Sequence, residues 1–190
     1  MKKIGKTETR YLTESALMIA LGTVLSMLKF EGLWAFGGGV TFCSMLPMVL
    51  ISYRWGVKKG LMTAGVYAVL QMLLGIDNIQ YATSIWMAAG IILLDYLVAY
   101  GVLGLAGMFR NKVKDPRLAL VCGIGLTFFL RFLCHFVTGW MIWDALWPND
   151  FGMLPAIYSL YYNGSYMLPE FLITSAVAAA FYRPLKKYLE

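Results

Sequence analysis

The sequence predicts an all-α integral membrane protein, a bundle of six transmembrane helices with both termini in the cytoplasm. Of the 190 residues, 60% are hydrophobic and only 14% are charged, and the mean hydropathy is +0.68. A soluble domain usually has about a quarter of its residues charged. The chain is therefore too apolar to fold as a water-soluble globule, and its length suits one membrane domain over residues 1–190.

Six apolar segments are the second observation. They cover about 11–29, 40–54, 57–75, 83–109, 117–143 and 162–183. A helix that crosses the bilayer needs about 20 apolar residues. The first segment follows a lysine-rich start but is too long for the apolar core of a signal peptide, so we expect a retained first span. No β-barrel alternation is present, which leaves helices as the expected spanning elements.

The third observation is where the basic residues lie. Fourteen of the sixteen are confined to the N-terminus, the C-terminus and alternate connections: Lys2, Lys3, Lys6, Arg10, Arg54, Lys58, Lys59, Arg110, Lys112, Lys114, Arg117, Arg183, Lys186 and Lys187. Basic residues are retained on the cytoplasmic side, so this alternation predicts cytoplasmic termini. It also explains the net charge of +6 without a nucleic-acid partner.

The connections on the opposite side are rich in Trp, Tyr, Asn, Asp and Gly. They cover residues 31–39, 75–86 and 143–166. An interfacial aromatic belt is the simpler interpretation. Because acids and amides are mixed with the aromatic residues on one side only, a pocket that faces outward is the alternative.

Four ionisable residues stand out within the apolar segments, where such groups are costly and usually functional. They are Asp95, Arg131, His135 and Glu170. An isolated buried carboxylate is strongly disfavoured. Asp95 is therefore expected either to pair with Arg131 or to serve as the counter-ion of a cationic substrate, and Glu170 is either a second pocket acid or a partner for Arg131.

The fifth segment carries polar and small residues at intervals of four. Arg131, His135, Gly139 and Trp143 follow one helical face. A lone histidine often makes only a hydrogen bond between helices, but here it precedes a run of aromatic and amide residues. Tryptophan faces bind flat cations, and the candidates that continue this face are Trp143, Trp147, Tyr158 and Asn163.

The sequence does not support several other classes of protein. The sequence has no P-loop, nucleophile elbow or zinc-protease motif, and its three cysteines show no metal-binding spacing. A single histidine excludes a site of several histidines. An intramembrane enzyme that uses His135 with Asp95 or Glu170 is the remaining alternative, but Cys134 and His135 point about 100° apart on a helix and do not readily pair.

Four stretches together resemble the thiamine-binding S-components (ThiT/YuaJ family) of energy-coupling factor (ECF) transporters. They are "LTESALMIAL", "LDYLVAYGVLGLAGMFR" and, most specifically, "LRFLCHFVTGWMIW" followed by "AIYSLYYNG". The resemblance implies a six-helix, plasma-membrane protein that binds thiamine near the outer surface. It also implies an energising module of one transmembrane subunit and two ATPases, which fits the missing nucleotide motif.

The resemblance also assigns residues. Trp34 would cover the pocket and Asp95 would contact the substrate, while His135 and Trp143 would line the site. Tyr158 and Asn163 would contact the pyrimidine, Gly139 would leave room for the substrate, and Ala16 and Ala20 would dock on the transmembrane partner. No cofactor or metal is implied, and no residue is assigned a catalytic role.

Two departures from the family pattern leave the substrate open. Family members have a Glu followed by a Tyr at the positions where this chain has Asp95 and Tyr96. The connection before residue 86 is also longer, so either Tyr81 or Trp86 is expected to reach the pocket. An S-component or stand-alone carrier for another small vitamin-like solute is therefore the alternative.

Overall fold

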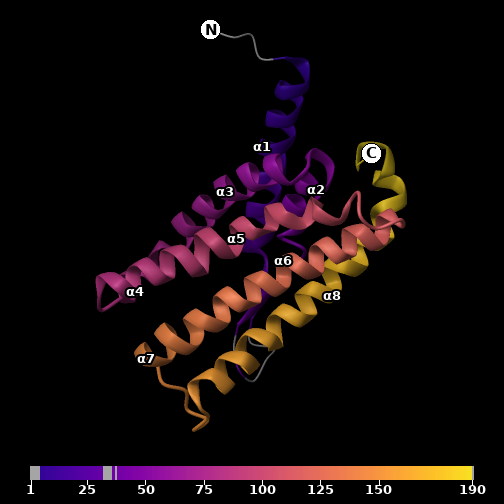
Figure 1. The fold of residues 1–190 in the computed structure, drawn as a ribbon. Helices are drawn as coiled ribbons and strands as arrows, with labels where there is room; N and C mark the ends of the chain where they lie inside the picture. The colour runs from indigo at the N-terminus through magenta and orange to yellow at the C-terminus, as the bar shows by residue number, and fades with distance from the viewer. Residues whose placement is uncertain (1–4, 32–35, 37, 190) are drawn as a thin grey trace.

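The computed structural model describes residues 5–31, 36 and 38–189, which are predominantly helical (Figure 1). The first half contains three helices and a short hairpin. Its elements are α1 (Lys6–Met27), β1 (Lys29–Glu31), β2 (Gly39–Thr41), α2 (Leu46–Trp55), α3 (Val57–Leu74) and the 3₁₀ helix η1 (Ile76–Tyr81).

The second half consists of three long helices. The first is continuous over Ile85–Phe109 and the second over Pro116–Leu146. The first long helix consists of α4 (Ile85–Gly90), π-helical η2 (Ile91–Val98), α5 (Ala99–Gly101) and 3₁₀-helical η3 (Val102–Phe109). The second consists of α6 (Pro116–Thr138), π-helical η4 (Gly139–Trp143) and α7 (Asp144–Leu146). The third is α8 (Pro155–Leu189).

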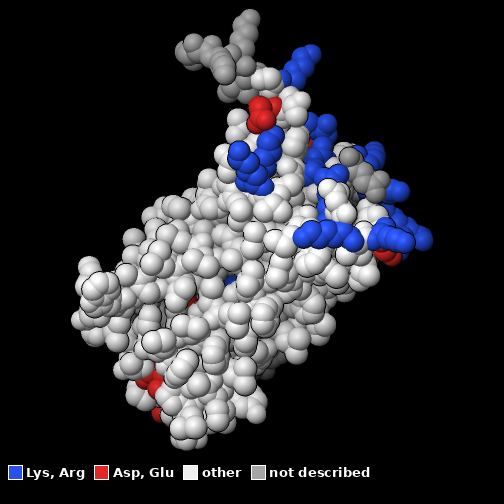
Figure 2. Space-filling model, in the orientation of Figure 1, with Lys and Arg blue, Asp and Glu red and all other residues white. Residues whose placement is uncertain are grey.

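Membrane character is strongest in these three long helices. In the described part of the chain, they alone are long and apolar enough to cross a bilayer by length and composition. The described residues nearest the two termini lie at one end of the bundle (Figure 1), and Figure 2 shows Lys and Arg gathered at that end. The count of six spans and the cytoplasmic position of the termini remain predictions.

Helix ends follow local sequence signals. Gly56 separates α2 from α3 with φ of 84°, a conformation that glycine adopts without the steric cost of a Cβ. The Asp115 carboxylate caps α6 by accepting a hydrogen bond from the Arg117 amide at 2.8 Å. Arg110 donates to the carbonyl oxygens of Tyr53 and Arg54, and so caps the last turn of α2.

The structure corrects two expectations about the connections. Residues 29–31 and 39–41 form an antiparallel hairpin, with Lys29 opposite Thr41 and Glu31 opposite Gly39, although the sequence predicted helices only. The last helix begins at Pro155, well before the predicted residue 162. Proline suits the first turn of a helix because its missing N–H is not needed there. Tyr158 therefore lies on a helix and not in a loop, and it shares this helix with Asn163 of the predicted segment 162–183.

Glycines allow the helices at the basic end to pack closely. A Cβ on Gly104 would overlap the backbone at Leu61, and a Cβ on Gly123 would overlap the backbone of Ala106. Small residues at helix contacts let backbones approach in a membrane protein. These contacts bring η3 against α3 and α6, around a core that includes Met48, Tyr67, Leu103, Leu120 and Ile124.

Replacing Gly123 with alanine is expected to destabilise the protein by about 1–3 kcal/mol, because the new methyl group displaces the Ala106 backbone. Thermal unfolding in detergent measures the change. Gly65→Ala is the matched control, since a Cβ there meets nothing within 4 Å and alanine favours the helix. Equal thermal midpoints for the two variants would contradict this packing argument.

Candidate functional site

A cavity of about 1100 Å³ lies between the hairpin, residues of α3, the two long helices that follow it, and α8. It holds most of the ionisable and aromatic residues singled out from the sequence. The predicted residues that line it are Asp95, Tyr96, Arg131, His135, Gly139, Trp143, Trp147, Tyr158, Asn163 and Glu170. A volume of this size accommodates a vitamin-sized ligand.

Asp95 is the most heavily hydrogen-bonded acid of the cavity. His135 Nδ1 lies 3.0 Å from one carboxylate oxygen, and Trp143 Nε1 donates to the other at 2.8 Å. Thr138 Oγ1 also donates to Asp95. The side chain of Asp95 is only 7% exposed, so these donors fix the position of a carboxylate that borders the cavity.

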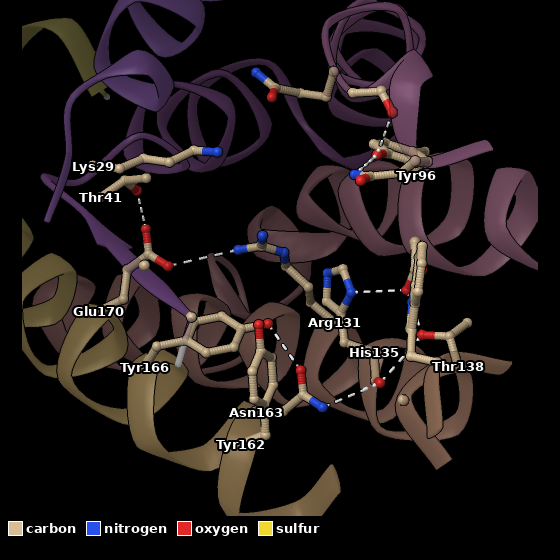
Figure 3. Close-up of a pocket in the computed structure, with 18 of the residues that line it drawn as sticks. Lys29, Thr41, Tyr96, Arg131, His135, Thr138, Tyr162, Asn163, Tyr166 and Glu170 are labelled. Atoms are coloured by element: carbon tan, nitrogen blue, oxygen red, sulfur yellow. Dashed lines mark hydrogen bonds and ion pairs between the residues drawn. The ribbon is translucent and has the colours of Figure 1, made fainter. Parts of the chain in front are cut away.

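His135 presents one free nitrogen beside this acid (Figure 3). With Nδ1 engaged by Asp95, its Nε2 is buried without a hydrogen-bond partner among the described residues. If Nδ1 donates its proton to the carboxylate, Nε2 carries a lone pair. His135 can then accept a hydrogen bond from a ligand inside the cavity.

Two π-helical segments carry the residues around Asp95. Asp95 lies in η2, and Trp143 ends η4, which follows directly after Thr138. A π-helical turn holds more residues than an α-helical one and is frequent at functional sites. Both long helices therefore change their register where they meet the cavity.

Aromatic rings form one wall of the cavity. The rings of Trp143 and Trp147 stack with centroids 5.6 Å apart and planes at 11°. Tyr81 packs its ring edge against Trp147 at 4.9 Å but does not line the cavity, and Trp86 is 83% exposed. Of the candidates from this connection, Tyr81 therefore supports the wall and Trp86 lies away from it.

The first turns of α8 form the facing wall. Asn163 Nδ2 donates to the carbonyl oxygen of His135 at 3.2 Å, and Tyr166 Oη donates to Asn163 Oδ1 at 2.9 Å. A Cβ on Gly139 would clash with Ser159 Oγ. The space that Gly139 leaves is thus filled in part by α8, which packs directly on η4.

Arg131 pairs with Glu170 and not with Asp95. Their charged atoms lie 3.7 Å apart, and Arg131 also lies over the Tyr100 ring at 4.7 Å. Glu170 is 2% exposed and accepts a hydrogen bond from Thr41 of β2. Of the two alternatives for Asp95, the ion pair with Arg131 does not form, because His135, Thr138 and Trp143 of the fifth apolar segment hold the Asp95 carboxylate instead.

The remaining predicted residues lie elsewhere. Ala16 and Ala20 are on the exposed face of α1. Trp34 falls outside the described residues, so its expected position over the pocket is untested. Within the described ranges, no group of three His, Cys, Asp or Glu residues is placed to hold a metal ion.

Other residues line the cavity without having been singled out from the sequence. Examples are Lys29, Thr41, Asn78, Thr138, Tyr162 and Tyr166. Helical spacing was the available signal for Thr138, which lies three residues after His135, and for Tyr166, three residues after Asn163. Lys29 and Thr41 depend on the hairpin, which the sequence analysis missed.

The fold is shared with solved S-components. A structure of ThiT from Listeria monocytogenes matches with a TM-score of 0.77 at 19% identity and covers 97% of this chain and 99% of that one. The S component of a bacterial ECF transporter matches with a TM-score of 0.62 at 18% identity and covers 96% and 99%. The chain therefore shares the fold of these two solved structures.

The chain belongs to the thiamine transporter protein family (Thia_YuaJ), whose sequence profile matches residues 12–190. The thiamine transporter ThiT of Bacillus subtilis (strain 168) is 29% identical over 188 residues, which cover 94% of this chain and 93% of that protein.

Proposed function

We propose that this protein binds thiamine in the cavity described above and delivers it into the cell as the S-component of an ECF-type importer. The observation that carries this proposal is the Asp95 carboxylate held between His135, Thr138 and Trp143 beside the stacked Trp143 and Trp147 rings. Thiamine combines a permanent thiazolium charge with a flat aminopyrimidine. These groups call for an acid, aromatic faces and polar edges in one cavity.

Each part of thiamine has a chemical counterpart in the cavity. The thiazolium would lie near Asp95 and a tryptophan face, because a carboxylate and a π-system both attract a flat cation. The amino group of the aminopyrimidine would donate to His135 Nε2, and its ring nitrogens would accept hydrogen bonds from the amide and phenol groups of α8. Asp95 places its charge closer to its own helix than a glutamate would, which favours contact through the tryptophan side of the site.

The direction of transport follows from the charge distribution. Basic residues gather at the end near both termini (Figure 2), whereas the hairpin, α7 and the start of α8 lie toward the other end (Figure 1). By the positive-inside rule the basic end is cytoplasmic. The cavity then takes up its substrate from outside the plasma membrane, and partner subunits that hydrolyse ATP supply the energy.

Titration of the purified protein with thiamine tests the proposal. Quenching of tryptophan fluorescence is expected to saturate if the ligand stacks on Trp143 or Trp147, and calorimetry gives the stoichiometry. Thiamine should compete far better than the free aminopyrimidine, the free thiazole alcohol or an unrelated vitamin. If the protein binds no thiamine up to millimolar concentration but binds a different vitamin, the proposal that thiamine is the substrate is wrong. The proposal that the protein is an S-component would then still stand.

Replacing Ala16 or Ala20 with tryptophan is expected to abolish thiamine uptake in cells that contain the energising module, with thiamine binding unchanged. Both alanines lie on the exposed face of α1, and a small-residue face permits close helix contact. Uptake of labelled thiamine and titration of the purified variants are the two measurements. Leu172→Trp, at an exposed position on α8 and so away from this face, is the control. Normal uptake in both alanine variants would contradict docking through this face.

A further inference from the structure

A second cavity lies at the basic end of the molecule, between the start of α6 and the end of α8. Its volume is about 490 Å³, and it is lined by Asp115, Pro116, Arg117, Tyr182, Arg183 and Lys186. It contains none of the residues that line the large cavity. The proposed transport function therefore leaves it unused.

Positive charge dominates this second cavity. Arg117, Arg183 and Lys186 are exposed, and among the described residues that line the cavity they outnumber one acid, Asp115. The Asp115 carboxylate is already engaged as the cap of α6, where it accepts from the Arg117 amide at 2.8 Å. The ligand that fits three cations around one hollow is an anion, and guanidinium groups suit phosphate oxygens in particular.

The setting of this cavity restricts which anion fits. Arg117 is the second residue of one apolar helix, and Arg183 and Lys186 lie in the last turns of another. The cavity is therefore at the level where a bilayer meets water. Leu118 is 52% exposed and Phe181 is 57% exposed, so apolar side chains adjoin the cationic residues in sequence. This pairing of cations with exposed apolar side chains suits an amphiphile with an anionic headgroup.

We propose that this cavity is a binding site for the headgroup of an anionic phospholipid such as phosphatidylglycerol. The phosphate would lie among Arg117, Arg183 and Lys186, and an acyl chain would run along the apolar surfaces of α6 and α8. Basic pockets between transmembrane helices on the cytoplasmic side recognise lipid headgroups in this way. The inference depends on the membrane placement of α6 and α8 and is independent of the substrate in the large cavity.

Native mass spectrometry of the intact protein, titrated with phosphatidylglycerol or phosphatidylcholine, tests the site. The unmodified protein is expected to retain phosphatidylglycerol in preference to phosphatidylcholine, and high salt should weaken this preference. The triple variant Arg117→Gln, Arg183→Gln, Lys186→Gln should bind phosphatidylglycerol at least about tenfold more weakly. This estimate follows because each cation near an anionic lipid surface contributes roughly fivefold in affinity.

A matched triple variant separates a built site from diffuse attraction. Lys58→Gln, Lys112→Gln and Lys114→Gln remove the same charge from exposed positions at the same end of the molecule, outside the cavity. Phosphatidylglycerol binding should change less than about twofold in this control. Equal losses in both triple variants, or equal retention of the two lipids, would overturn the site. Displacement of the lipid by inorganic phosphate at matched concentration would also overturn it, since the headgroup alone would then be recognised as a free anion.

Two further measurements keep the result interpretable. Thiamine titration of all variants shows whether the fold and the large cavity are intact, so that failure of the lipid site is distinguished from failure of the proposed function. If the triple variant does not fold, Arg117→Gln and Arg183→Gln are tested singly, and each should weaken phosphatidylglycerol binding by about fivefold. Unchanged affinity in both single variants would overturn the site.

Discussion

Replacing Asp95 with asparagine is expected to weaken thiamine binding by roughly thirtyfold to several thousandfold, which corresponds to about 2–5 kcal/mol. The variant removes the negative charge that faces the thiazolium. It also places an amide N–H₂ within reach of Trp143 Nε1, which donates to Asp95 at 2.8 Å in the native protein. Calorimetric titration with thiamine measures the loss.

Two comparisons isolate the role of the charge at Asp95. The free aminopyrimidine, which is neutral, should lose far less affinity than thiamine in the Asp95→Asn variant. Asp77→Asn makes the same change at an exposed position outside the cavity and should bind thiamine normally. If thiamine and the neutral pyrimidine lose affinity equally, Asp95 only positions Trp143 and His135 and does not act as the counter-ion.

Replacing Glu170 with alanine is expected to lower the free energy of unfolding by about 3–5 kcal/mol, because the variant leaves the buried Arg131 guanidinium without its carboxylate. The same change removes the acceptor of the Thr41 hydroxyl and with it one hydrogen bond between β2 and α8. Thermal unfolding in detergent measures the effect. Thiamine affinity should fall as well, since both charged residues line the cavity.

The double variant Arg131→Met, Glu170→Leu should be more stable than either single variant, since replacing a whole buried ion pair by apolar residues is often tolerated. Glu8→Ala is the control, because its partner Lys59 forms an exposed pair at 2.9 Å and such pairs contribute at most about 1 kcal/mol. Strictly additive losses in the double variant would show that Arg131 and Glu170 do not stabilise each other.

The long apolar helices could be predicted from the sequence with useful accuracy. The expected segment 57–75 corresponds to α3 at Val57–Leu74, and 83–109 corresponds to the continuous helix Ile85–Phe109. Length and apolar composition suffice here, because a long uninterrupted apolar segment has few alternatives to a helix in a membrane. The start of α8 at Pro155 was missed, since its first turns carry tyrosine, serine and asparagine that read as a polar connection.

The sequence predicted which residues form much of the candidate site, but it did not predict which of them pair with one another. Spacing placed His135, Gly139 and Trp143 on one side of a helix, and the cavity contains all three. The choice of Glu170 as the partner of Arg131 depends on how α8 packs against α6, which no local pattern specifies. The contribution of Lys29 and Thr41 depends on strand pairing across a glycine-rich connection, where local signals are weak.

The π-helical segments η2 and η4 change the direction in which the residues beyond them face, over the first turns of one long helix and the last turns of the other. Within an α-helix each residue turns the chain by about 100°, so one residue accommodated in a wider turn rotates everything beyond it by that angle. Removing one residue from η2 or η4 would restore uniform winding and change which side chains beyond it face the cavity. Insertions and deletions in η2 and η4 can therefore change ligand specificity, while the helices at the basic end of the bundle keep their contacts.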